Sequence, residues 1–243
     1  MPASPSLLAE ATAALRTQWL RLRPWVGALV DSEAAGEPSV LDGWTTVELV
    51  VHLGRAMDAL AVCAPAPPGT VPLTLAEYLG SYPGRDADIS ALTHELATRH
   101  AADPLGYVDA GARGAFATLD RFAEHDVVVQ ARRSPILLSE MTVSRVIELV
   151  VHADDLLRSL HRVRGADAPP DPVDPGALDL AARTLLGIVV ARVGDDLEVA
   201  EARTWVRLAT GRTPYDVDVL AVALRPRYAS DGVPDLGRLL PVL

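Results

Sequence analysis

The amino-acid sequence predicts a mainly α-helical protein, in which a helical bundle is followed by a small α/β unit. The composition is 49% hydrophobic and only 5% aromatic, and Ala, Leu and Val are abundant, which favours packed helices over a β-sandwich. Long segments before residue 165 carry the apolar periodicity of helices. A proline-rich stretch at 165–176 then separates them from the remaining residues.

The first three helical segments are bounded by stop signals. The first covers about residues 5–30, where apolar side chains recur on one stripe. The second begins at Thr45 and ends before the Pro- and Gly-rich cluster at 65–69. The third covers about 74–100, and we expect it to break at Pro83-Gly84, because proline disrupts a helix interior.

A shorter helix is predicted at 103–123 and a long one at 139–162. Between them, apolar runs at 127–129 and 136–138 flank Arg132-Arg133-Ser134-Pro135, which indicates a short hairpin or two extended pieces.

The C-terminal residues show a mixed pattern. We expect a helix at 177–193, an extended or helical piece at 205–209, a strand at 217–224 and helical turns near 236–240. The predicted organisation is therefore a bundle at 1–164, a proline-rich linker at 165–176 and a small domain at 177–243 that packs against the bundle.

Charge and cysteine content exclude several classes of protein. The formal net charge is -10, and acidic residues accompany the arginines along the whole chain, which argues against binding to nucleic acid. We see no signal peptide and no apolar run long enough to cross a membrane, so we expect a soluble cytoplasmic protein. The single cysteine, Cys63, excludes an internal disulfide and a cysteine-based zinc cluster, and we expect it to be buried and unreactive.

A five-residue sequence occurs twice, as Glu48-Leu-Val-Val-His52 and as Glu148-Leu-Val-Val-His152. A spacing of four places the Glu and the His on one face of a helix. Imidazole and carboxylate suit zinc and similar ions, so His52 with the pair Glu148 and His152 can form a three-ligand site with an open coordination position. The alternative is that the polar residues on each of these two helices form the solvent-facing edge of an otherwise apolar helix.

Other polar residues near these segments have two interpretations. Thr45-x-x-Glu48 at a helix start is the pattern of a capping box, so we favour a cap over a metal ligand for Glu48. Asp155 lies one turn beyond His152, where it can hold the ring of a ligating histidine or be a surface carboxylate. The weaker histidine candidates are His94, His100, His125 and His161.

Two segments carry a resemblance to a known family. Gly43-Trp44-Thr45 leading into the first repeat, and Arg145 to Leu156 around the second, resemble the mycothiol-dependent maleylpyruvate isomerase group of DinB-like metal-binding four-helix bundles. The resemblance spans about residues 5–162. It implies that zinc is bound by His52, Glu148 and His152, that Trp44 is structural, and that the helix at 103–123 is an excursion or part of the third bundle element.

The resemblance also implies a second domain similar to sterol carrier proteins, although the tail is short for one. Thr204 to Arg212 looks like its helix-opening segment. The family uses an arginine near the cleft for an anionic substrate, and the candidates in this chain are Arg85, Arg207, Arg212 and Arg225.

The implied function is activation of the thiol of mycothiol for addition to an electrophilic, carboxylate-bearing small molecule. Isomerisation and S-transfer both fit the residues. The alternatives are a metal-dependent hydrolase, in which the metal activates water, and a non-enzymatic metal-binding or regulatory bundle. The residues leave the oligomeric state open.

Overall fold

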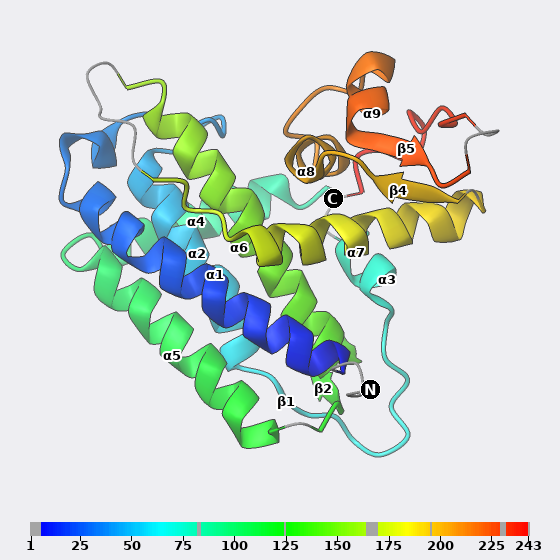
Figure 1. Cartoon of the computed structure of the whole chain (residues 1–243). Coiled ribbons are helices and arrows are strands. Elements are labelled where there is room, and N and C mark those ends of the chain that lie inside the picture. The colour runs from blue at the N-terminus through cyan, green and yellow to red at the C-terminus, as the bar shows by residue number, and fades with distance from the viewer. Residues whose placement is uncertain are drawn as a thin grey trace.

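The computed structural model describes residues 6–81, 84–123, 125–163, 170–194, 196–228 and 232–242. Four long helices pack side by side as a bundle (Figure 1). They are α1 (Leu7–Val30), α2 (Thr46–Ala61), α5 (Pro104–Phe122) and α6 (Leu138–Leu160). The protein is therefore mainly helical, as the sequence predicts. Helix α2 packs along α5 and α6, and α1 packs along α6.

Helices α1, α2 and α5 each begin with a side-chain cap. The hydroxyl of Thr45 accepts the amide N–H of Glu48, and the Glu48 side chain accepts the amide N–H of Thr45, so the predicted capping box of α2 is confirmed. Helix α5 begins with Pro104 after an Asp103 cap, because proline fits the first turn of a helix.

The structure decides between the two roles that the resemblance left open for the helix at 103–123. Residues 104–122 form it as α5, whereas 74–100 form the excursion, which consists of α3 (Leu75–Leu79) and α4 (Asp86–Arg99). The expected interruption lies between α3 and α4; Pro83 is outside the described residues. Helix α4 packs on α2, which brings it beside the first repeated segment.

Short strands cover one end of the bundle. They are β1 (Ala64–Pro65), β2 (Val128–Gln130) and β3 (Pro135–Leu137), in an antiparallel sheet of order β1-β2-β3. The expected hairpin is therefore present, with Val129 opposite Ile136 and both side chains buried. A short 3-10 helix, η1 (Glu33–Gly36), follows α1.

The C-terminal part begins with α7, which packs on α1 and α6 and leads to the remaining elements (Figure 1). The elements are α7 (Pro175–Val193), β4 (Leu197–Val199), α8 (Ala202–Ala209), α9 (Val217–Ala223) and β5 (Leu224–Pro226). Strands β4 and β5 pair antiparallel. In the predicted linker, the described residues 170–174 form neither helix nor strand; 164–169 lie outside the described part.

One prediction for this part was wrong, and another was correct only in part. Residues 217–223 form helix α9 instead of a strand, because the Asp216 carboxylate caps the amides of Asp218 and Val219, and Leu220 and Ala223 are buried three residues apart. Near 236–240 there is a single turn, in which Leu239 and Leu240 donate to the Leu236 carbonyl. The piece at 205–209 is helical, as part of α8.

None of the helices in the described part of the chain is long and apolar enough to span a membrane.

Candidate metal centre

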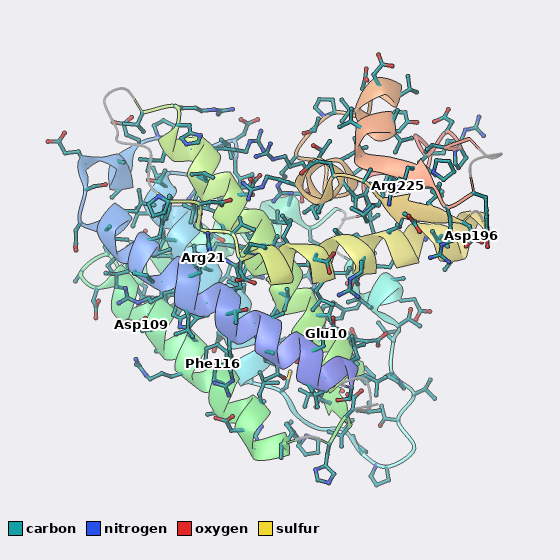
Figure 2. The ribbon with its side chains drawn as sticks, in the orientation of Figure 1. Glu10, Arg21, Asp109, Phe116, Asp196 and Arg225 are labelled. Atoms are coloured by element: carbon teal, nitrogen blue, oxygen red, sulfur yellow. The ribbon has the colours of Figure 1, made fainter. Side chains whose placement is uncertain are left out.

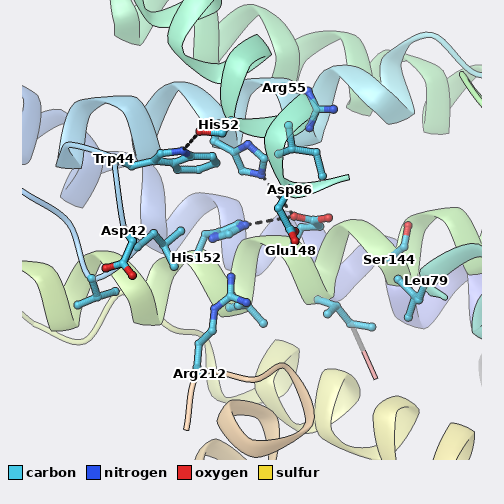
Figure 3. Close-up of a pocket in the computed structure, with 16 residues that line it drawn as sticks. Asp42, Trp44, His52, Arg55, Leu79, Asp86, Ser144, Glu148, His152 and Arg212 are labelled. Atoms are coloured by element: carbon cyan, nitrogen blue, oxygen red, sulfur yellow. Dashed lines mark hydrogen bonds and ion pairs between the residues drawn. The ribbon is translucent and has the colours of Figure 1, made fainter. Parts of the chain in front are cut away.

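The three predicted metal ligands meet at one point between α2 and α6. The ligand atoms of His52, Glu148 and His152 all lie within 4.8 Å of one another. Glu148 Oε2 lies 3.3 Å from His152 Nε2 and 3.8 Å from His52 Nε2. Both imidazoles are buried, at 5% and 6% exposed for His52 and His152, so the two repeated segments supply one shared site (Figure 3).

The Nδ1 atom of each imidazole, which is the nitrogen that does not face Glu148, also contacts a polar side chain. The Nδ1 atom of His152 lies 3.1 Å from Asp155 Oδ2, and Asp155 is fully buried, so it takes the ring-holding role that the sequence left open. The Nδ1 atom of His52 lies 3.3 Å from the Thr93 hydroxyl, which itself donates to the Ile89 carbonyl. Both partners therefore accept from an Nδ1–H, which leaves the Nε2 lone pairs facing Glu148.

The second oxygen of Glu148 faces a cation. Its Oε1 atom lies 3.7 Å from the guanidinium of Arg145, which is buried on the preceding turn of α6. Burial by itself would raise the pKa of the Glu148 carboxyl, but its polar contacts with the His152 and His52 rings and the charge of Arg145 hold this pKa well below its usual range. Glu148 is therefore an ionised carboxylate.

The two histidines differ in basicity. Burial lowers the pKa of His52 to about 4, which keeps the ring neutral. Burial also acts to lower the pKa of His152, but the hydrogen bonds to Asp155 and Glu148 outweigh it and raise the pKa. A positive charge among these groups is therefore stabilised. In the absence of other cations a proton on His152 supplies it.

The donor set fits a divalent metal ion. Two Nε2 lone pairs and one carboxylate oxygen face each other. Electron-rich atoms this close together repel one another, and a cation bound between them relieves the repulsion. Two imidazoles with one carboxylate are a common catalytic zinc set, with a fourth position left for an exogenous ligand. The fixed Nδ1–H tautomers are those that a metal-ligating histidine needs.

A cavity of about 530 Å³ opens directly over the three residues. Apolar side chains form much of its wall, among them Leu41, Ile89, Ile147 and Val151. The cavity is large enough for a small organic ligand. The loop that carries Leu41 is tied to α6, because the amide of Val40 donates to the Ser159 hydroxyl.

Among the predicted arginines, Arg212 lines this cavity. It follows α8, and its Nε atom lies 3.1 Å from Asp155 Oδ2, the same oxygen that His152 Nδ1 contacts. Figure 3 shows Arg212 beside His152. Arg207 instead forms two hydrogen bonds with Asp154, both at 2.7 Å.

The other two predicted arginines are not among the described residues that line the cavity. Arg85 lies 4.0 Å from Asp88 at the start of α4. Arg225 lies on β5, where it pairs with Glu198 (Figure 2).

Sequence reasoning missed several residues that form the site. Trp44, interpreted as structural, also lines the cavity, with its ring 4.9 Å from that of His52. Arg55, one turn after His52 on α2, lines it as well. Its i, i+3 spacing from His52 is the signal that could have found it. Thr93 has no such signal, because it comes from a separate helix.

The weaker histidine candidates lie apart from the three converging residues. His94 contacts Glu48, with Nδ1 2.8 Å from Oε1. His100 stacks on Tyr107, and His125 approaches the Phe122 carbonyl. His161 caps the end of α6.

Comparisons with known proteins identify the family of this chain. No curated protein matches it. It is similar to a solved structure, described as the crystal structure of the mycothiol-dependent maleylpyruvate isomerase, with 19% sequence identity and a TM-score of 0.49 over 75% of this chain and 69% of that chain. The family described as mycothiol maleylpyruvate isomerase N-terminal domain matches residues 15–157, which is more than half of the chain and includes both repeated segments. This protein therefore belongs to the mycothiol maleylpyruvate isomerase N-terminal domain family.

Proposed function

We propose that the chain binds one divalent metal ion, expected to be zinc, through Nε2 of His52, Nε2 of His152 and the carboxylate of Glu148. The observation that carries the proposal is the convergence of these three acceptors, with both Nδ1 atoms already engaged elsewhere. A metal ion bound by three protein ligands keeps a position for an exogenous thiol and lowers the pKa of that thiol.

The thiol is expected to be mycothiol, since the family is named for it. The residues around the cavity then have defined tasks. Apolar side chains such as Ile89, Ile147 and Val151 limit the access of water to the sulfur. Arg212 and Arg55 bring positive charge to the wall, which suits a substrate with a carboxylate group.

The proposed reaction is addition of the sulfur to an electrophilic carbon, with loss of the thiol proton. If the substrate rotates about the former double bond and the carbon–sulfur bond then breaks, the thiol is regenerated and the substrate is isomerised. If the bond persists, an S-conjugate leaves. The protein is thus an isomerase or an S-transferase of small electrophiles.

Metal content tests the ligand set. We expect purified wild-type protein to bind about one zinc per chain, and His52→Ala and His152→Ala to lose at least 100-fold in zinc affinity by calorimetric titration. His100→Ala is the matched control, because this histidine stacks on Tyr107. Unchanged metal affinity in both ligand variants would refute the proposed site.

Proton release tests the chemistry. Mixing zinc-loaded protein with mycothiol should release about one proton per chain at neutral pH, and a screen of maleylpyruvate-like acids should yield isomers or conjugates. Hydrolysis without any thiol would favour a metal-dependent hydrolase instead. Zinc binding with neither activity would favour a non-enzymatic metal-binding bundle.

A further inference from the structure

A second set of side chains connects the cavity wall to the surface. The Trp44 indole N–H donates to the Ser90 hydroxyl at 3.0 Å, and Ser90 Oγ lies 3.2 Å from His94 Nε2. His94 Nδ1 lies 2.8 Å from Glu48 Oε1. Trp44 and Ser90 line the cavity, whereas the His94 side chain is 44% exposed. The chain of hydrogen bonds therefore runs from the cavity to solvent.

The direction of each hydrogen bond follows from the groups themselves. Burial acts to raise the pKa of Glu48, but the Thr45 amide and the His94 hydrogen bond outweigh it and lower the pKa, so the carboxylate is ionised and can only accept. Neutral His94 then carries its proton on Nδ1, which leaves Nε2 as an acceptor. Ser90 consequently donates its hydroxyl proton to Nε2.

Ser90 retains one acceptor position. A hydroxyl oxygen has two lone pairs, and the Trp44 N–H occupies one of them. The second can accept a proton from a group in the cavity that Ser90 lines. Trp44 also contacts the ring of His52, which places this hydroxyl on the same side of the cavity as the proposed metal ligands.

Capping of α2 does not account for the arrangement. Glu48 uses Oε2 to accept from the amide and the hydroxyl of Thr45, which completes the cap, and Oε1 is left for His94. Thr74 and Glu77 form the same capping box at the start of α3, likewise through a single carboxylate oxygen. The cap therefore needs only one oxygen of the glutamate.

We propose that Ser90, His94 and Glu48 form a proton relay that takes up the proton released by the substrate thiol and passes it to solvent. The inference rests on the proposed function. The thiol proton moves to Ser90 Oγ as the Ser90 proton moves to His94 Nε2. The resulting imidazolium stays paired with Glu48 through its Nδ1–H and gives the Nε2 proton to water, which restores the starting tautomer. Sulfur keeps the electron pair, and Ser90 returns to its starting state.

Proton-release kinetics test the relay. Zinc-loaded protein is mixed with mycothiol in a stopped-flow instrument with a pH indicator. We expect Ser90→Ala and His94→Gln to release the same amount of proton as wild type but at least tenfold more slowly, with unchanged zinc affinity. Matched controls are His100→Gln, at the residue that follows α4, and Glu77→Gln in the equivalent capping box, and both should release the proton at the wild-type rate.

Two further measurements separate a relay from a structural role. Added imidazole should restore fast proton release to His94→Ala, which a loss of packing would not allow. Nitrogen NMR of the metal-free protein should find the neutral His94 ring protonated at Nδ1. An Nε2-protonated ring, or wild-type rates in both Ser90→Ala and His94→Gln, would overturn the relay alone. Absence of proton release from the wild-type protein would overturn the proposed function and the relay together.

Discussion

At the scale of single residues, the site depends on acceptors that fix the histidine tautomers. Asp155 holds His152 from the same helix, three residues away, and Thr93 holds His52 from another helix. Each leaves Nε2 free to face Glu148. Partners of this kind orient metal ligands, and losing one costs about 10- to 100-fold in metal affinity.

Thr93→Val should therefore weaken zinc binding by about tenfold or more, because valine has the shape of threonine but cannot accept the His52 Nδ1–H. Thr118→Val is the control: this threonine is also buried, and its hydroxyl donates to the Ala61 carbonyl on α2. Calorimetric titration of both variants checks the prediction. Equal affinities in the two would mean that Thr93 does not orient His52.

Cys63 should be unreactive in the native protein, as the sequence predicted. Burial raises the pKa of its thiol from 9.0 to about 11, so on the order of 0.1% is thiolate at pH 8. An aromatic disulfide reagent should react at least 100-fold more slowly with native than with urea-unfolded protein. Because the folded-state pKa is raised, the associated stability is complete below about pH 9 and is lost as the pH rises to about 11. Equal reaction rates would contradict this burial.

At the scale of elements, the position of α2 depends on how closely α5 approaches it. A Cβ atom added at Gly111 on α5 would lie 2.6 Å from the carbonyl oxygen of Gly54 on α2. Backbone atoms on both sides cannot move independently, so a larger residue would separate the two helices. Gly54 is two residues after His52, so the close approach of α5 to α2 also affects the position of His52, a proposed metal ligand.

Gly111→Ala should destabilise the protein by about 1–3 kcal/mol through overpacking, and should weaken zinc binding as α2 shifts. Gly187→Ala, within α7, is the matched control, since an added Cβ there meets nothing within 4 Å. It should stabilise by about 0.5–1 kcal/mol, because alanine has the better helix propensity. Urea unfolding measures both, and a Gly111→Ala protein as stable as wild type would show that the two helices can separate freely.

Element types were predictable where local signals were strong. The long helices have apolar periodicity, α1, α2 and α5 also have a capping side chain, and the Thr45–Glu48 box was predicted correctly. Residues 217–223 were predicted wrongly because Val-rich runs have β propensity, whereas the Asp216 cap and the packing of Leu220 select a helix. Packing also decided that α5, and not α4, is the third bundle helix.

At the scale of the whole molecule, the C-terminal part contributes to the cavity of the bundle. Arg207 forms an ion pair with Asp154, and Arg212 forms one with Asp155. Two neighbouring carboxylates on α6 therefore bind the segment that contains and follows α8. Buried apolar side chains from both parts form one continuous cluster. The division at 165–176 stays a prediction, but α7 packs on α1 and α6.

Arg212→Gln should lower kcat/KM for a carboxylate substrate by about 10- to 100-fold, because a charge-assisted hydrogen bond is worth about 1.5–3 kcal/mol. Arg225→Gln, on the surface of β5, should leave it unchanged. Steady-state kinetics with a charged substrate and its uncharged ester check the assignment. A loss of equal size for both substrates would mean that Arg212 acts through Asp155 instead of contacting the carboxylate.

The sequence by itself determined the helical class, the capping box of α2 and the shared face of Glu148 and His152, because spacing along one helix fixes which side chains lie together. That His52 joins this pair as a metal ligand was a prediction from the repeat and the family resemblance. Only the tertiary structure decided that the two repeated segments face one another, that Thr93 and Trp44 border His52, and that Arg212 rather than Arg85, Arg207 or Arg225 lines the cavity. Those juxtapositions join residues far apart in the chain. Helix packing and loop paths set them, and no local periodicity encodes either.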